Sequence, residues 1–337
     1  MTRPLILIAI LACCWLWVPR SAHAATTCSL VGTTPLNFGT VTGDGTVDAT
    51  GSVTLNCTTT AVSLLAKARV RMCINIGTGD SGGGQINPRR MTNPAGDPMQ
   101  FQIFQDPART EIWGHRDDPT APTPRMVDVE YDVPLIVGAS RDRTFVLYGR
   151  VPAQAGLAAG AHANLFAGTH ARVDYRYAET ILGSPPYPAS CIGGGNGGGS
   201  FSFPFSASAS VPHHCSINAA TDLDFGSVPG LIENPHDQTS SVTVTCTGRT
   251  AWRMSMDDGL HAAGGQRRMR RDGGTDHVRY ELYGNPGRTQ RWGADSTGLT
   301  GTGTGSSQTL TVYGRVPGGQ AVPAGRYSDT ITVTVTY

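Results

Sequence analysis

The sequence has few charged and few aromatic residues. Charged residues make up 15% of its 337 residues and aromatic residues 7%, and the formal net charge is +1. Soluble globular proteins usually carry about a quarter of charged residues. The small net charge excludes an overall electrostatic attraction to nucleic acid or to an anionic membrane. Lysine occurs once, at Lys67, so arginine supplies nearly all of the positive charge.

Helical periodicity is also nearly absent. Short runs alternate apolar and polar residues instead, such as SVTLN, TFVLYGRV and TITVTVTY, and turns rich in Gly, Asn, Asp and Pro separate them. Strict alternation is typical of strands that bury one face. The sequence therefore predicts an all-β protein made of immunoglobulin-like sandwiches, without the buried Trp between paired cysteines that marks true immunoglobulin domains.

An internal repeat sets the number of domains. Six blocks recur in the same order: CSLVGTTPLNFGTV with CSINAATDLDFGSV, SVTLNC with SVTVTC, Arg89-Arg90-Met91 with Arg267-Arg268-Met269, Trp113-Gly114 with Trp292-Gly293, YGRVP with YGRVP, and HARVDYRY ending at Tyr177 with TITVTVTY ending at Tyr337. We expect two tandem domains of ordinary size, residues 25–182 and 212–337, joined by residues 183–211. The second domain is expected to lack its last strand.

The first 24 residues are typical of an export signal. Arg3 precedes an apolar run from Leu5 to Val18, and Ala22-His23-Ala24 is a small-x-small cleavage site. A signal anchor is the alternative, although the run is short for a membrane span. Cleavage would leave Ala25 as the first residue, three positions before Cys28.

Six cysteines remain after removal of Cys13 and Cys14 with the signal. The repeat predicts two equivalent disulfides, and the two cysteines without counterparts are left for each other: Cys28–Cys57, Cys215–Cys246 and Cys73–Cys191. Zinc is the competing interpretation, with His213-His214-Cys215 as its nearest candidate. Adjacent side chains of a strand point to opposite faces, so these residues do not readily share a metal. We expect no cofactor.

The sequence ends in a strand with one apolar face. This face is made of Ile331, Val333, Val335 and Tyr337, and threonines alternate with it. The matching block of the first copy is followed by a further strand-like segment, whereas nothing follows Tyr337 in this sequence. We therefore expect these four residues to line an open groove that receives a strand from another chain.

Residues 201–211 belong to neither repeat. Phe201, Phe203 and Phe205 alternate there with Ser and Pro, and Ala and Val continue the apolar face. We expect this segment to supply the missing last strand of the first domain in cis, although Pro204 removes one backbone donor. A spacer with chance alternation is the alternative. The preceding stretch, IGGGNGGGS, has the composition of a flexible linker.

These features resemble the spore coat U domain proteins, the subunits of archaic chaperone–usher pili. Both copies carry the early cysteine, an FG-V block (Phe38 and Phe225) and the YGRVP block. The most specific part is the terminal run G-x-Y-x-D-x-I-x-V-x-V-x-Y, at Gly325, Tyr327, Asp329, Ile331, Val333, Val335 and Tyr337. In the first copy HARVDYRY keeps the alternation without the G-x-Y-x-D spacing.

The resemblance implies incomplete sandwiches that a periplasmic chaperone completes during folding. At the outer-membrane usher, the N-terminal extension of the neighbouring pilin subunit then replaces the chaperone strand. Only Ala25-Thr26-Thr27 precede Cys28 after cleavage, so this protein is expected to accept a strand and to donate none. It resembles a two-domain tip adhesin of these pili, exported through the periplasm to the cell surface.

The resemblance also implies that apolar loops of the first domain attach to an abiotic or host surface and support biofilm formation. The candidate residues lie in loops without good counterparts in the second copy: Leu64, Leu65, Leu157, Leu165 and Phe166. Exposed apolar loop tips would mark an interaction site. The alternative is that these residues are core. A carbohydrate-binding adhesin is a further alternative, although no cluster of aromatic residues with carboxylates is evident.

Three other classes were compared with this interpretation. The acidic pairs Asp117-Asp118 and Asp257-Asp258 fall in no catalytic motif and look like turn formers, so we expect no enzyme. The run 267–271 is rich in arginine, but export and the small net charge argue against nucleic acid, and an outward strand or loop is expected. A secreted spore-coat or matrix protein without a pilus shares nearly every feature.

Overall fold

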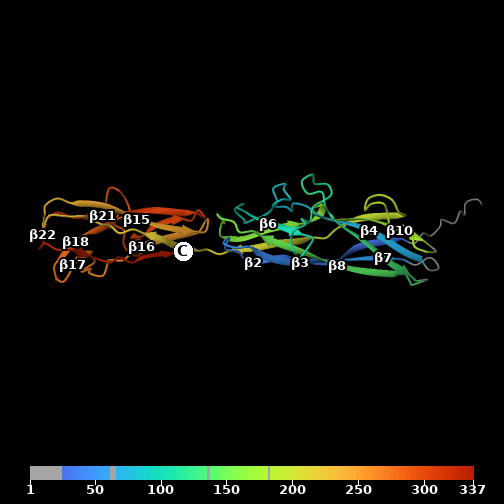
Figure 1. Cartoon of the computed structure of the whole chain (residues 1–337), viewed down its shortest axis with the longest axis horizontal. Helices are drawn as coiled ribbons and strands as arrows, with labels where there is room; N and C mark the ends of the chain where they lie inside the picture. The colour runs from blue at the N-terminus through green and yellow to red at the C-terminus, as the bar shows by residue number, and fades with distance from the viewer. Residues whose placement is uncertain (1–24, 61–65, 135–136, 181–182) are drawn as a thin grey trace, which may run out of the picture.

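The computed structural model describes residues 25–60, 66–134, 137–180 and 183–337. They form two β-sandwiches that lie end to end, with the C-terminus at the end of the second sandwich that faces the first (Figure 1). We call residues 26–211 the first sandwich and residues 215–336 the second. No helix in the described ranges is long and apolar enough to cross a membrane.

The first sandwich contains an eight-stranded and a four-stranded sheet. The larger sheet has the order β1 (Thr26–Thr34), β3 (Val47–Thr59), β8 (Ala139–Val151), β6 (Pro98–Phe104), β5 (Arg89–Thr92), β9 (Gly160–Phe166), β12 (Phe205–Val211) and β2 (Leu36–Thr40). The smaller has the order β11 (Gly197–Ser202), β10 (Ala171–Thr180), β4 (Ala66–Ile76) and β7 (Arg125–Val133). A 3-10 turn, η2 (Gly168–His170), leads into β10.

The second sandwich is built from shorter strands. One sheet has the order β13 (Cys215–Ala220), β15 (His236–Cys246), β21 (Ser307–Val316) and β19 (Glu281–Tyr283). The others are β20 (Leu299–Thr302), β16 (Ala251–Met256) and β24 (Val333–Thr336); β18 (His277–Arg279), β17 (Arg268–Arg271) and β23 (Tyr327–Ser328); and the pair β14 (Leu231–Ile232) and β22 (Gln320–Ala321). A 3-10 turn, η3 (Asp295–Thr297), precedes β20.

Strand β4 shows why these sequences form half-buried strands. Val70, Met72 and Ile74 point into the core and are fully buried, whereas the alternate residues Arg69 and Arg71 point outward. Because successive side chains of a strand alternate in direction, a period of two separates the apolar face from the charged face. Each sandwich encloses its own apolar core.

The six cysteines among the described residues all form disulfides. Cys28 bonds to Cys57 across β1 and β3, Cys215 bonds to Cys246 across β13 and β15, and Cys73 of β4 bonds to Cys191. This is the pairing that the repeat predicts. Because its sulfur is in a disulfide, Cys215 is no thiolate ligand for zinc.

Candidate functional site

A buried tryptophan anchors the same position of each sandwich. Its indole Nε1 donates to a carbonyl of the central strand, from Trp113 to Ile74 at 2.8 Å and from Trp292 to Met254 at 2.8 Å. Residues that make the same bond occupy equivalent positions. Ile74 of β4 therefore corresponds to Met254 of β16.

This equivalence corrects the alignment of the terminal blocks. Ile74 lies opposite Val173 of β10, and Met254 lies opposite Val335 of β24. Tyr337 therefore corresponds to Tyr175. The sequence comparison instead aligns it with Tyr177. A shift of two residues keeps every side chain on its original face of the strand, so alternation alone does not distinguish the two registers.

The terminal run is present in the first copy as well. Asn164 Oδ1 accepts from Ser81 N at 3.1 Å, and Asp329 Oδ1 accepts from His261 N at 3.2 Å. Each side chain lies against a glycine with positive φ: Asn164 against Gly79 and Asp329 against Gly259. A Cβ at either glycine would come within 2.2 Å of the side chain that faces it. Asn164 thus holds the position of Asp329. The first copy therefore has Asn164 in place of the aspartate of the run, and η2 with its flanks separates this position from β10.

In the second sandwich the same aspartate binds a tyrosine. Tyr280 Oη donates to Asp329 Oδ2 at 2.8 Å. Burial, followed by this bond to a carboxylate, raises the pKa of Tyr280. Phe101 is at the corresponding place in the first sandwich, because it lies opposite Arg89 as Tyr280 lies opposite Arg267. The Phe101 ring packs edge-on to the Phe166 ring.

Residues 197–211 cross both sheets of the first sandwich. β11 pairs with β10, and β12 lies between β9 and β2, antiparallel to β9 and parallel to β2. Phe203 and Phe205 are buried in the core, and Phe201 packs against it from β11. This segment therefore forms the final strands of the first sandwich.

The second half of the glycine run before Phe201 is part of a strand and not a flexible linker. Gly197–Ser202 forms β11, opposite Arg172–Tyr177 of β10. A Cβ at Gly197 would lie 2.4 Å from the Tyr177 hydroxyl, and a Cβ at Gly198 would lie 2.2 Å from the Tyr175 carbonyl oxygen. The glycines allow β11 to approach the two tyrosines closely, so composition alone was misleading here.

The second sandwich leaves the matching surface uncovered. In the first sandwich Leu36, Phe38 and Val41 are buried, and Val41 N donates to Ser210 O of β12 at 2.9 Å. Their counterparts in the second sandwich form no strand and are only partly buried: Leu223, Phe225 and Val228. The two sets are equivalent because Leu36 and Phe38 pack on Gly149 as Leu223 and Phe225 pack on Gly314.

Two residues of the terminal run continue this surface. Tyr327 and Ile331 are partly buried against the second core, and Ile331 corresponds to Phe166, which is fully buried against β12. We call Leu223, Phe225, Val228, Tyr327 and Ile331 the apolar strip. It corresponds to the surface that β12 covers in the first sandwich.

The remaining predicted groove residues lie along β24. Val333 and Val335 are partly buried against the core, and β24 pairs on one side with β16. Tyr337 is 57% exposed, and its ring packs edge-on to His214. Its counterpart Tyr175 is 6% exposed because β11 covers it. A donated segment as long as β11 and β12 together would therefore cover both Tyr337 and the apolar strip.

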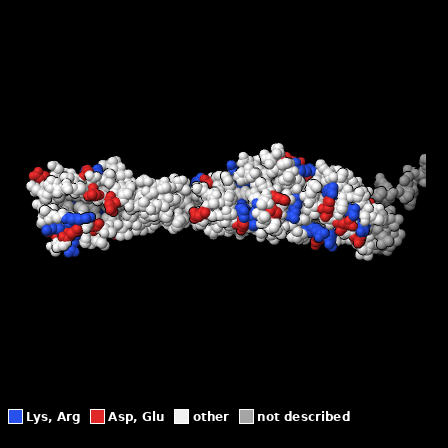
Figure 2. Space-filling model, viewed as in Figure 1, with Lys and Arg blue, Asp and Glu red and all other residues white. Residues whose placement is uncertain are grey.

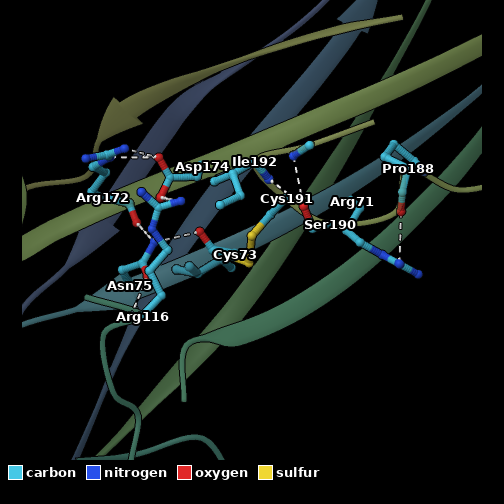
Figure 3. The surroundings of a disulfide bond; sticks show 12 residues. Arg71, Cys73, Asn75, Arg116, Arg172, Asp174, Pro188, Ser190, Cys191 and Ile192 are labelled. Carbon is cyan, nitrogen blue, oxygen red and sulfur yellow. Dashed lines mark hydrogen bonds and ion pairs between the residues drawn. A yellow bond between two sulfur atoms is a disulfide. The ribbon is translucent and has the colours of Figure 1, made fainter. Parts of the chain in front are cut away.

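A strap of residues 183–196 connects β10 to β11 along the outer face of the smaller sheet. Arg71 Nη1 donates to Pro188 O at 2.9 Å, and Arg69 Nη1 donates to Pro185 O at 2.8 Å. Figure 3 shows the Cys73–Cys191 disulfide fixing the strap beside a buried carboxylate, Asp174, which accepts from Arg172 and Asn75. Pro185–Pro188 therefore lie on the sheet and not in a free loop.

The predicted surface-binding residues lie in different environments. Leu157 and Phe166 are buried in the first core, so their assignment to an exposed binding loop was wrong. Leu157 lies where the second sandwich contacts the first, and Phe166 faces β12. Leu165 is 49% exposed, and Leu64 and Leu65 lie outside the described residues.

Charged motifs in the sequence have structural partners. Arg267, expected on an outward strand, is buried and donates to the carbonyls of Met256 and Trp292, as Arg89 does to Ile76 and Trp113 in the first sandwich. Each acidic pair forms turns, since Asp118 accepts from Thr120 N and Asp257 from Gly259 N. Within the described ranges, no three His, Cys, Asp or Glu side chains are grouped as metal ligands.

The chain is similar to several known proteins. "Protein U" of Myxococcus xanthus is 35% identical over 144 residues, which cover 38% of this chain and 80% of that protein. The fold is similar to that of a CsuC–CsuE chaperone–tip adhesion subunit complex of Acinetobacter baumannii (17% identity, 92% of this chain, 100% of that chain, TM-score 0.43). It is also similar to that of the CupB6 tip adhesin of Pseudomonas aeruginosa (13% identity, 93% and 96% covered, TM-score 0.37).

The model of the Spore Coat Protein U domain matches the chain twice, over residues 17–169 and 201–334. The first match ends before β10 and the second begins just before β12, and together the two matches span most of the sequence. The protein belongs to the Spore Coat Protein U domain family.

Proposed function

We propose that this protein is the tip subunit of an archaic chaperone–usher pilus, and that its second sandwich accepts a strand from the neighbouring subunit. The observation that carries the proposal is the contrast between the two copies. Leu36, Phe38 and Val41 are buried alongside β12, whereas the equivalent residues of the apolar strip have no such neighbouring strand among the described residues and are only partly buried. An added strand satisfies backbone groups and fills apolar positions at once.

The proposed partners act in sequence on this strip. A periplasmic chaperone would cover it during export, and exchange at the outer-membrane usher would replace the chaperone strand with that of the next subunit. The position at the tip is supported by β1, which pairs with β3 from Thr26 onward. Thr26 and Thr27, which come directly before Cys28, are thus already paired with β3 within the first sandwich.

We place surface attachment at the end of the first sandwich that lies away from the second. The turn between β7 and β8 is at this end, since Ala139 lies opposite Thr59 and Val133 opposite Ala66. Val137 in this turn is 83% exposed. Attachment to an abiotic or host surface, and biofilm formation through it, would use apolar contacts of this kind.

Two exposed valines allow a matched test of this attachment site. Val137→Asp is expected to reduce attachment of piliated cells to an apolar surface such as polystyrene, because it places a charge at the contact. Val31→Asp, on the side of the first sandwich, is expected to leave attachment unchanged. Equal attachment by both variants would show that the binding surface does not include Val137.

A synthetic peptide tests strand acceptance directly. The peptide carries residues 197–211, the segment that completes the first sandwich, and is added to the full-length chain. We expect slower hydrogen exchange of the backbone amides of residues 325–331 and a higher melting temperature of the second sandwich. A control peptide with Phe203→Asp and Phe205→Asp should produce neither effect. If the first peptide also has no effect, the second sandwich does not accept a strand.

The family description favours a second candidate, a secreted coat or matrix protein without a pilus. Immunogold labelling of intact cells separates the two functions. Label confined to fibre tips supports the pilus subunit, and label spread over the envelope supports the coat protein.

A further inference from the structure

The second sandwich contacts the first mainly through the loop that carries Gly248 and Arg249, and Gly305 also lies against Gly156. Gly248 N donates to Leu157 O at 2.9 Å, and Ala159 N donates to Gly248 O at 2.8 Å, so Gly248 forms a parallel bridge with Ala158. Arg249 pairs with Asp97, with Nη2 3.0 Å from Oδ1. This bond is the main cause that lowers the pKa of Asp97, so the carboxylate is ionised at neutral pH.

The contact loop is tied to the strand that completes the first sandwich. β12 ends at Val211, and the disulfide Cys215–Cys246 follows it. Thr247 N donates to His214 O at 2.9 Å, and the loop residues Gly248 and Arg249 come next. A domain that inserts such a strand therefore brings its contact loop to the same end of the acceptor.

The second sandwich has its own version of the contacted surface. Asn93 N donates to Asp97 O, and Arg271 N donates to Asp276 O, so Asp276 corresponds to Asp97. Gln154 and Gln320 bind the backbone of Gln100 and Arg279 in the same two-bond pattern. Counting back from Asn164 and Asp329 aligns Leu157, Ala158 and Ala159 with Val322, Pro323 and Ala324.

The two versions differ in whether anything covers them. Leu157, Ala158 and Ala159 are buried, whereas Pro323 and Ala324 are exposed and Val322 is half-buried. We call Asp276 and Val322–Ala324 the docking face. Strand β22, which ends one residue before Val322, lies at the outer end of the second sandwich (Figure 1). Figure 2 shows side chains of both charges at this end.

We propose that the docking face binds the next pilus subunit at a second contact, beside the donated strand. The occupant is a pilin domain that carries its donor strand ahead of its first cysteine and a Gly-Arg pair after its second. Its glycine bridges Pro323, and its arginine pairs with Asp276. This inference rests on the proposed function, because the donated strand delivers the loop. The junction within this chain is then a template for the junction between subunits.

A tandem chain tests the proposal with known parts. A second copy of residues 176–337 is appended after Tyr337, because Tyr337 corresponds to Tyr175, and Cys191 of the appended copy is changed to Ser. Pro323→Cys in the original second sandwich is combined with Gly248→Cys in the appended copy. The disulfide between them is detected by peptide mapping after mild oxidation. The reference is Ala158→Cys with Gly248→Cys at the natural junction, where a Cβ at 248 would lie 3.5 Å from the Ala158 Cβ.

We expect the new pair to cross-link at a rate comparable to the reference pair. Asp276→Arg should lower the rate about two- to fivefold, the effect of an exposed ion pair, and Arg249→Asp in the appended copy should restore it. Phe205→Asp in the appended copy should abolish cross-linking, because the strand no longer inserts.

Hydrogen exchange separates the docking-face proposal from the strand-acceptance proposal. It is measured in the same tandem chain, on residues 325–331 of the original second sandwich. Protection of these amides without cross-linking would overturn the docking face and leave strand acceptance intact. No protection would overturn strand acceptance, and the docking face with it. Protection together with the charge-dependent cross-link supports both.

Discussion

The ring of Phe205 lies parallel to the ring of Phe166, with their centroids 4.6 Å apart and their planes 2° apart. The two residues are directly opposite each other in the pairing of β12 with β9. A segment that belongs to neither sequence repeat thus contributes an aromatic partner to the first core. In the second sandwich Ile331 holds the position of Phe166, and no described residue holds that of Phe205.

Removal of this ring should destabilise the first sandwich. Phe205→Ala is expected to lower its free energy of unfolding by about 3–5 kcal/mol, because it removes a buried aromatic side chain and leaves a cavity. Urea unfolding of the full-length chain measures the change. Ser210→Ala, on the exposed side of the same strand, is the control and should have little effect. Equal stability of the two variants would mean that β12 is not part of the core.

The strap disulfide should hold β11 on the smaller sheet. Cys73→Ser combined with Cys191→Ser opens a loop of 118 residues in the unfolded chain. Loops of this length correspond to about 2–5 kcal/mol of stability, and the loss is expected in the first sandwich. Hydrogen exchange of the β11 amides should become faster, while exchange in β16 of the second sandwich stays the same. Unchanged exchange in β11 would show that the arginine contacts to the strap suffice.

The buried arginine of each sandwich should not tolerate lysine. Arg89 donates to Gly77 O at 2.8 Å and to the carbonyls of Ile76 and Trp113 at 2.6 Å each. Arg89→Lys loses the fork geometry, and each buried carbonyl left without a donor costs about 1–3 kcal/mol. Thermal unfolding of Arg90→Lys, at the next position, gives the control, for which we expect a small change. A similar melting temperature for both variants would contradict this role of Arg89.

Alternation was sufficient to predict the fold class, because a one-sided strand needs a period of two. It did not fix long-range register, since Tyr175 and Tyr177 lie on the same face and either can align with Tyr337. It also gave no information about residues 197–199, where the absence of side chains permits close approach to β10. The docking face depends on which loop of one sandwich reaches the other. That relationship is set by tertiary contacts such as Asp97 with Arg249, which no local pattern encodes.

The bond between Tyr280 and Asp329 should make the second sandwich sensitive to alkaline pH. The folded state raises the pKa of the Tyr280 phenol above its ordinary value of 10.0, through burial and then the carboxylate. Above pH 10 the unfolded chain therefore releases this proton while the folded chain keeps it, so stability falls as pH rises, by up to about 1.4 kcal/mol per pH unit. Below pH 9 this group contributes no slope. Tyr280→Phe should lack the alkaline slope and should lose about 1 kcal/mol at neutral pH with the hydrogen bond. Hydrogen exchange in β16 of the full-length chain, compared between wild type and variant from pH 8 to pH 11, measures both effects. Parallel profiles above pH 10 would show that Tyr280 ionises as readily folded as unfolded.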